Sequence, residues 1–123
     1  MLHGIGTDIV EIKRIKAAVE KWGDSFLKRI FTDNEISYCF KNKNPYPCLA
    51  GRFAVKEAFI KALSMPDAVS LSDIEVLNEE SGKPFLKVSG SLAQYSQMFS
   101  IHLSLSHERH YSVASVALER LKA

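Results

Sequence analysis

The pattern of residues 51–63, GRFAVKEAFIKAL, constrains the fold of this chain more than any other stretch. At 3.6 residues per turn, it places apolar residues on one broad side and again between two charged edges. Arg52 and Lys56 form one of these edges, and Glu57 and Lys61 form the other. A helix exposed to solvent would be polar between such edges. The pattern therefore predicts a long central helix that the rest of the chain covers on most sides.

Glu57 needs a partner on this helix, because it lies beside apolar residues and an unpaired buried charge is costly. One candidate is Lys61, one turn later, in an ordinary helical ion pair worth a few tenths of a kcal/mol. The other is a divalent cation. The helix taken alone favours the ion pair.

Length and composition indicate one globular domain, residues 1–123. The chain is long enough for one core and too short for two, and 46% hydrophobic and 24% charged residues are ordinary proportions. A net charge of +2 gives no argument for nucleic acid. We see neither a signal peptide nor a membrane span, so we expect a cytoplasmic protein without a membrane partner. Cys39 and Cys48 lack metal-ligand spacing and are predicted to be free thiols in a reducing compartment.

Residue periodicity along the chain predicts an α+β fold. Thr32 and Glu35 match a capping box, which is the preferred interpretation of Glu35, and Pro47 suits the first position of the central helix. Because the strands come as hairpins without regular βαβ alternation, we expect an antiparallel sheet packed around the central helix. Strands are predicted at residues 3–11, 71–77, 85–88, 101–107 and 111–118, and further helices at 12–22, 24–31, 32–39 and 90–99.

Asp8 is unusual in the first predicted strand, because aspartate is disfavoured in strands. It could accept backbone hydrogen bonds at a strand end or bind a metal, and the sequence favours neither. Gly4 and Gly6 suit the close approach of a ligand or another backbone. Asp8 and Glu57 together with water would suit Mg²⁺, which takes further ligands from phosphate oxygens. The basic residues of the central helix have the charge that a phosphate-rich substrate requires.

Other patterns carry weaker indications. The helix at 12–22 is basic on one side, which is either a solvated face or a docking surface for an acidic partner. Its basic residues are Lys13, Arg14, Lys16 and Lys21. Ser104, Ser106 and His107 lie too close together along one strand for a catalytic triad, and there is no phosphate-binding glycine loop.

Four segments in this order resemble the holo-[acyl-carrier-protein] synthase family of the 4′-phosphopantetheinyl transferase superfamily. They are GIGTDIVEI at 4–12, FTDNEISYC at 31–39, GRFAVKEAFIKAL at 51–63 and LSLSHERHYSVASVAL at 103–118. The resemblance implies Mg-dependent transfer of phosphopantetheine from coenzyme A to a serine of acyl carrier protein, for fatty acid biosynthesis. It also implies a homotrimer with sites shared between subunits, and docking of the acidic carrier protein on the basic helix.

The resemblance also implies residue roles. Asp8 and Glu57 match the Mg²⁺ ligands, and Lys61 matches a lysine that contacts a coenzyme A phosphate and assists the leaving group. The positions that match the cofactor site are Arg52, Lys56, Gly82, Lys83, Pro84, Ser106 and His107. The chain departs from the family pattern at Ser64-Met65-Pro66, where a glycine usually follows the central helix, and at Glu108.

Two other functions are compatible with the residues. One is a non-catalytic module that binds an acidic partner helix through residues 13–21. The other is a metal-dependent hydrolase of nucleotide pyrophosphates, in which water replaces the protein serine as acceptor.

Overall fold

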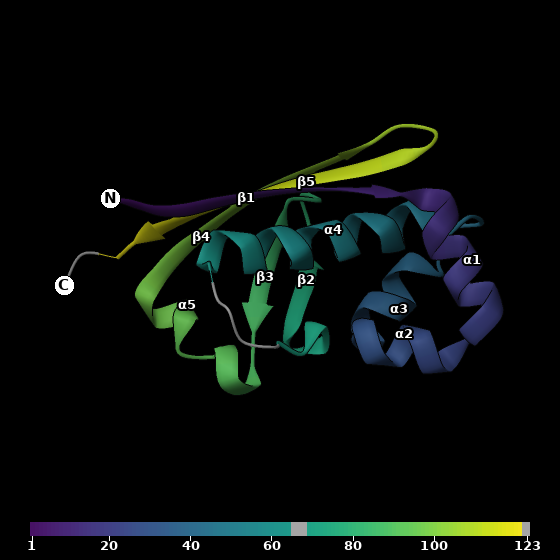
Figure 1. Ribbon diagram of the computed structural model, residues 1–123, viewed down its shortest axis with the longest axis horizontal. Helices are drawn as coiled ribbons and strands as arrows, with labels where there is room; N and C mark the ends of the chain where they lie inside the picture. Colours follow the sequence, from purple (N-terminus) through teal and green to yellow (C-terminus); the bar gives the residue numbers. More distant parts are fainter. Residues whose placement is uncertain (65–68, 122–123) are drawn as a thin grey trace.

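The computed structural model describes residues 1–64 and 69–121 of the chain. Figure 1 shows a long helix beneath a sheet, with three shorter helices gathered at one end. The elements are β1 (Leu2–Glu11), α1 (Ile12–Trp22), α2 (Asp24–Ile30), α3 (Asp33–Cys39), α4 (Tyr46–Leu63), η1 (Leu71–Asp73), β2 (Ile74–Asn78), β3 (Pro84–Val88), η2 (Gly90–Leu92), α5 (Tyr95–Met98), β4 (Phe99–His107) and β5 (Tyr111–Arg120).

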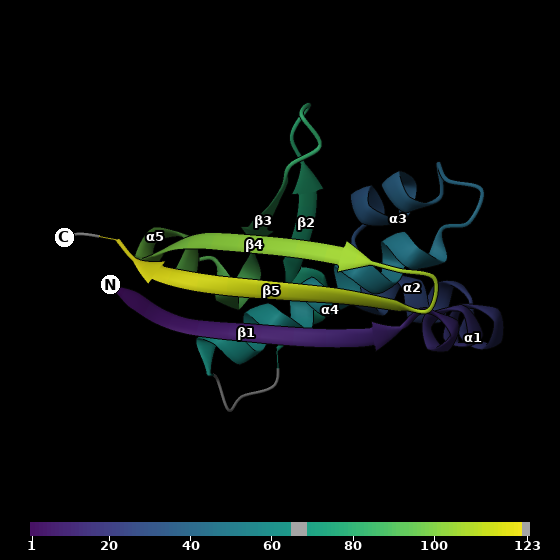
Figure 2. The same cartoon turned by 90° about the horizontal axis from the view of Figure 1, so that it is seen from above.

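The strands form two antiparallel sheets. One has the order β1-β5-β4, and the other is the β2–β3 hairpin. In Figure 2 the hairpin runs crosswise to the three-stranded sheet. This arrangement confirms the predicted α+β fold with an antiparallel sheet packed on a central helix.

Helix α4 is the centre of the hydrophobic core. Leu49, Ala54, Val55, Ala58 and Phe59 are fully buried, as expected from a helix that is apolar on most sides. Because the small alanines leave room for the sheet, α4 and β1 approach each other closely.

Gly4 and Gly6 make that close approach possible. A methyl group on Gly6 would overlap the carbonyl oxygen of Ala58, and one on Gly4 would overlap that of Ala62. The glycines were expected to allow the close approach of a ligand or of another backbone. The structure shows that the backbone of α4 approaches them.

Glu35 of α3 contacts its own helix start, strand β2 and helix α4. It completes the predicted capping box with Thr32, and its other oxygen accepts a hydrogen bond from the Val76 amide at 2.9 Å. It also forms a fully buried ion pair with Lys56, with 2.7 Å between Oε1 and Nζ. The cap is confirmed, but it is only part of the role of Glu35.

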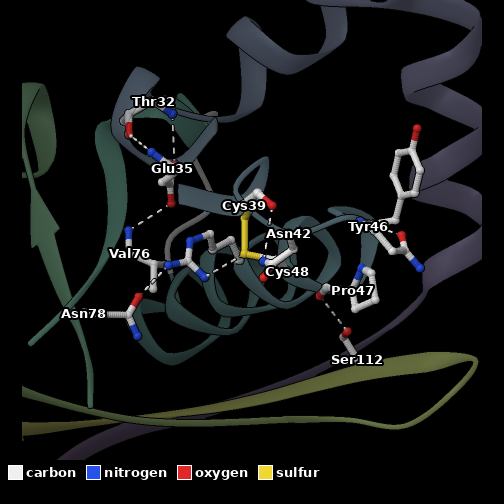
Figure 3. Close-up of a disulfide and its surroundings, with 12 residues drawn as sticks. Thr32, Glu35, Cys39, Asn42, Tyr46, Pro47, Cys48, Val76, Asn78 and Ser112 are labelled. Carbon is white, nitrogen blue, oxygen red and sulfur yellow. Dashed lines mark hydrogen bonds between the residues drawn. A yellow bond between two sulfur atoms is a disulfide. The ribbon is translucent and has the colours of Figure 1, made fainter. Parts of the chain in front are cut away.

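The prediction of two free thiols is wrong. Cys39, the last residue of α3, and Cys48, near the start of α4, form a disulfide with 5.4 Å between their Cα atoms (Figure 3). Sequence spacing gave no sign of it, because the turn between the helices, not the spacing, brings the two residues together.

Two predicted elements differ in detail. The strand expected at 71–77 begins with the single turn η1, and the helix expected at 90–99 is divided into η2 and α5. The predicted helix stop is described as far as Ser64, whereas Met65 and Pro66 lie outside the described residues. None of the described helices has the length and apolar character needed to cross a bilayer.

Candidate active site

Asp8 and Glu57 meet in a cavity of about 390 Å³ between β1, α1, α2 and α4. Asp8 points toward α4 because residues alternate along β1, so that Gly6, Asp8 and Val10 share the covered side. Its position in the middle of β1 removes the alternative of a strand-end aspartate. The two carboxylates that the sequence singled out thus lie in one cavity, although 49 positions separate them in the chain.

Lys61 contacts Asp8 beside this cavity. Its ammonium donates to Oδ1 of Asp8 at 3.1 Å and to the carbonyl oxygen of Thr7 at 3.0 Å. The lysine side chain is 53% exposed, whereas that of Asp8 is 17% exposed. The helix taken alone favoured Glu57 as the ion-pair partner of Lys61. In the structure, Lys61 pairs with Asp8 instead.

The electrostatics of the cavity act against the charge of Glu57. Partial burial raises the pKa of the Glu57 carboxyl, and the neighbouring Asp8 raises it further, while Lys61 opposes both effects. A carboxylate in this position gains from a cation that binds both acids.

The donor set fits a hard divalent cation. Two carboxylates beside an open cavity suit Mg²⁺, which usually keeps several waters and takes one or two carboxylates from a protein. Among the described residues, no group of three or more histidine, cysteine, aspartate and glutamate side chains comes together. An all-protein cage of the kind that holds structural zinc is therefore not formed by that part of the chain.

The apolar wall of this cavity includes residues to which the sequence analysis gave no site role. These residues are Phe53 of α4, Phe26 of α2 and Ala18 of α1. Phe53 lies between the charged edges of the central helix, and that unusual position was the available signal.

A second cavity, of about 580 Å³, lies on another side of α4. It is lined by Arg52, Gly82, Pro84 and His107, four of the positions that matched the cofactor site. It shares no lining residue with the cavity of the acid pair. Arg52 and Glu57 are five residues apart on one helix, so they point in widely different directions.

Arg52 is held at the wall of the second cavity by side chains from three elements. Its guanidinium donates to Oδ1 of Asn78 at 2.6 Å and to Sγ of Cys48 at 3.4 Å, and it lies 4.4 Å from the centre of the Tyr38 ring. Asn78 in turn donates to the carbonyl oxygen of Gly82 at 2.9 Å. The sequence analysis missed Tyr38 and Asn78, because their contacts depend on segments distant in the chain.

Lys56 does not belong to either cavity. Its ammonium is fully buried and donates to Glu35, to the carbonyl oxygen of Leu71 and to that of Ile74. With all three donors used, it has none left for a phosphate. Burial lowers the pKa of Lys56, and the carboxylate of Glu35 opposes this effect. The expectation that Lys56 lines a cofactor site is therefore wrong for this conformation of the chain.

The remaining predicted positions lie at the surface. Lys83 and Ser106 are exposed and adjoin residues of the second cavity in the chain, but they are not part of its lining. Lys13, Arg14, Lys16 and Lys21 are all exposed on α1. Arg14 borders the acid pair, whereas Lys13 and Lys16 border a third cavity of about 530 Å³ with Tyr46 and Arg109.

Two carboxylates at one cavity, with basic residues nearby, suit a metal-assisted reaction on a phosphorylated ligand. The family model of the 4′-phosphopantetheinyl transferase superfamily matches residues 4–117. The chain is 47% identical to the holo-[acyl-carrier-protein] synthase of Halothermothrix orenii over 123 residues, which is 97% of this chain and 98% of that protein.

Solved structures agree with this match. A holo-(acyl-carrier-protein) synthase from Bacillus anthracis, in complex with CoA (3′,5′-ADP), has a TM-score of 0.83 and 39% identity, and the match covers 98% of this chain and 99% of that one. The Helicobacter pylori enzyme in complex with coenzyme A has a TM-score of 0.83 and 33% identity, over 94% and 99% of the two chains. The chain belongs to the 4′-phosphopantetheinyl transferase superfamily, which confirms the resemblance.

Proposed function

We propose that this chain transfers the 4′-phosphopantetheine group of coenzyme A to a serine of acyl carrier protein, with Mg²⁺ held by Asp8 and Glu57. The observation that carries the proposal is that these two carboxylates line one cavity, with Lys61 in contact with Asp8, in a chain of this superfamily. The names of its relatives, two of which were solved with coenzyme A or its adenosine bisphosphate part, support the donor and the acceptor.

In this reaction the serine hydroxyl gives up its proton to a carboxylate or a water at the site, and its oxygen forms a bond to phosphorus. The bond from that phosphorus to the leaving adenosine 3′,5′-bisphosphate breaks. A Mg²⁺ ion supplies charge neutralisation on the phosphate oxygens when bound. Asp8 and Glu57 would hold the ion at the cavity and so orient the phosphate groups of the ligand. Lys61 is mostly exposed beyond its contact with Asp8, so its ammonium can also reach a phosphate oxygen and stabilise the charge of the leaving group.

The site as proposed needs two copies of the chain. Arg52, Gly82, Pro84 and His107 line one cavity and the acid pair another, so one subunit by itself does not bring the predicted cofactor contacts together. Apolar residues on the outer side of β1, with Ile5 65% and Ile9 62% exposed, offer a surface for self-association. We therefore propose that neighbouring subunits share each site, and we take the number of subunits, a homotrimer, from the resemblance to the family.

The partner surface is proposed to be the edge of α1 next to the acid pair. Arg14 lines that cavity, and Lys21 lies two turns further along the same side. An acidic carrier protein would be attracted to this edge and would bring its serine to the acid pair. Cytoplasmic location remains part of the proposal, as does the shared role of Lys13 and Lys16 in docking.

The test is the intact mass of apo acyl carrier protein after incubation with the chain, coenzyme A and Mg²⁺, with an EDTA-treated control. We expect a gain of one phosphopantetheine that EDTA abolishes. Asp8→Ala and Glu57→Ala should abolish the gain while the circular dichroism spectrum stays unchanged. An active double variant would refute the assignment of the acid pair.

The alternative of a non-catalytic binding module predicts a different result. Such a module would bind carrier protein without consuming coenzyme A, and it would have no use for two carboxylates in one cavity. A hydrolase would release phosphopantetheine into solution rather than attach it to the carrier protein. The same mass measurement, with analysis of the small molecules, separates the three functions.

A further inference from the structure

The position of Arg52 depends on a segment that a disulfide closes. Tyr38, one of the three groups that hold the guanidinium, lies directly before Cys39. A second group, Cys48, belongs to the disulfide and also lies one turn before Arg52 on α4. Arg52 is only 4% exposed, so its guanidinium cannot reorient without moving these neighbours. The third group, Asn78, comes from β2 and is independent of the disulfide.

The same segment forms one wall of the second cavity. The residues that it contributes to the lining are Tyr38, Asn42, Asn44, Pro47 and Cys48. Figure 3 shows the disulfide between Cys39 and Cys48, with Asn42 beside it and Asn78 across from it on the neighbouring strand. The bond joins positions nine residues apart, so it restricts the whole turn between α3 and α4.

We propose that the Cys39–Cys48 disulfide is a redox-sensitive bond that holds Arg52 and this wall in place, and so controls the affinity of the second cavity for the phosphorylated end of coenzyme A. The inference rests on the proposed function and adds a regulation to it. The disulfide is well placed for this role, because Cys48 lines the cavity while Cys39 is fully buried.

Reduction by a dithiol proceeds through two thiol–disulfide exchange steps. A thiolate of the reductant attacks Sγ of Cys48 from the cavity, the bond between the two protein sulfurs breaks, and Cys39 leaves as a thiolate that takes a proton. The second thiol of the reductant then displaces Cys48. The products are two protein thiols and the oxidised, cyclic disulfide of the reductant. A disulfide oxidant reverses these steps.

The reduced chain loses the restriction on the turn, so the Tyr38 ring no longer holds Arg52 in one place, whereas Cys48 stays one turn away from Arg52 on α4. Loss of one such contact weakens ligand binding by roughly three- to tenfold. Asp8, Glu57 and Lys61 lie at a different cavity and have no contact with the disulfide, so the chemical step should change little. We expect KM for coenzyme A to rise and kcat to stay within about twofold.

The experiment compares oxidised and dithiol-reduced wild-type chain. Alkylation followed by intact mass verifies the redox state, since two alkyl groups are added only after reduction. Coenzyme A affinity is measured by calorimetry, and transfer to acyl carrier protein by mass. We expect weaker binding and a higher KM in the reduced state, with both restored by reoxidation.

Cys39→Ala is the matched variant, because its side chain is buried and lies outside the cavity lining. It should bind coenzyme A as the reduced wild-type chain does, and it should not respond to the reductant. If Cys39→Ala does not fold, reversible cycling of the wild-type chain carries the test alone. Circular dichroism verifies that the reduced chain stays folded.

The outcomes separate the two proposals. Equal affinity and equal KM in both redox states, with transfer intact, would overturn the redox proposal and leave the proposed function standing. Neither binding nor transfer in either state would overturn the proposed function, and the redox inference with it.

Discussion

The ammonium of Lys61 lies 3.1 Å from Oδ1 of Asp8, although Glu57 precedes Lys61 by one turn of the same helix. The pair joins α4 to β1 over 53 positions of sequence. Lys61 also donates to the Thr7 carbonyl oxygen, so the helix and the strand are connected at the acid pair itself. Because the lysine is exposed, its contribution to stability is small, and its main effect is expected on activity.

Lys61→Ala should therefore separate activity from stability. We expect transfer to fall by roughly a hundredfold or more, since a charge that stabilises the leaving group is lost, and the free energy of unfolding to change by less than about 1 kcal/mol. Transfer kinetics and urea unfolding measure the two effects. Lys28→Ala, at an exposed position of α2, is the control. A variant with near-normal kcat would remove Lys61 from the chemistry.

Glu57 should make the metal-free chain less stable as the pH rises. The pKa of Glu57 is raised in the folded chain, so folding favours its protonated form. The stability that this preference gives is fully present below the ordinary pKa of 4.5, and it is lost as the pH rises through the raised pKa. Glu57→Gln should then be more stable than the wild-type chain at neutral pH, and the difference should disappear in acid. Thermal unfolding in EDTA across this range measures it. A less stable variant at neutral pH would contradict the sign of the shift.

The buried pair of Glu35 and Lys56 should be essential to the fold. Glu35→Gln leaves the Lys56 ammonium buried without a counter-charge, which we expect to cost about 3–5 kcal/mol in the free energy of unfolding. Urea unfolding measures the loss. Glu20→Gln, which changes an exposed charge, should change it little. The double variant Glu35→Gln/Lys56→Met should recover part of the loss, and strict additivity would show that the two groups are not coupled.

Ser64 should be a site where a substitution stabilises the chain. It ends α4 with φ 58° and ψ 37°, a left-handed conformation that favours glycine. Ser64→Gly should raise the free energy of unfolding by about 1 kcal/mol, since only a weak contact of 3.4 Å to the Lys61 carbonyl oxygen is lost. Ser64→Ala keeps the backbone strain and should not stabilise.

The sequence predicted a large part of the fold because the relevant signals are local. The strand β1 alternates, α1 and α4 have helical periods, and Thr32 with Glu35 forms the cap that the pattern indicated. The single turn η1 and the division of residues 90–99 were missed, since short elements have weak periodicity.

The acid pair could be found in part from the sequence, because charged residues at apolar positions of β1 and α4 are conspicuous by themselves. Which groups they contact could not be found. The helix taken alone favoured Glu57 as the partner of Lys61, which lies against Asp8. Lys56 was expected to contact a ligand and lies against Glu35. In both cases the partner of the lysine is an acidic residue from a distant segment of the chain.

The sequence by itself determined that a mostly apolar helix would lie at the centre of an antiparallel α+β domain, because residue periodicity fixes which sides of each element are covered. Only the tertiary structure decided that Cys39 forms a disulfide with Cys48, and that Arg52 and the acid pair line different cavities of one chain. These facts depend on how α3, α4 and the sheet pack together. Contacts between distant segments set them, and such contacts leave no periodic trace in the sequence.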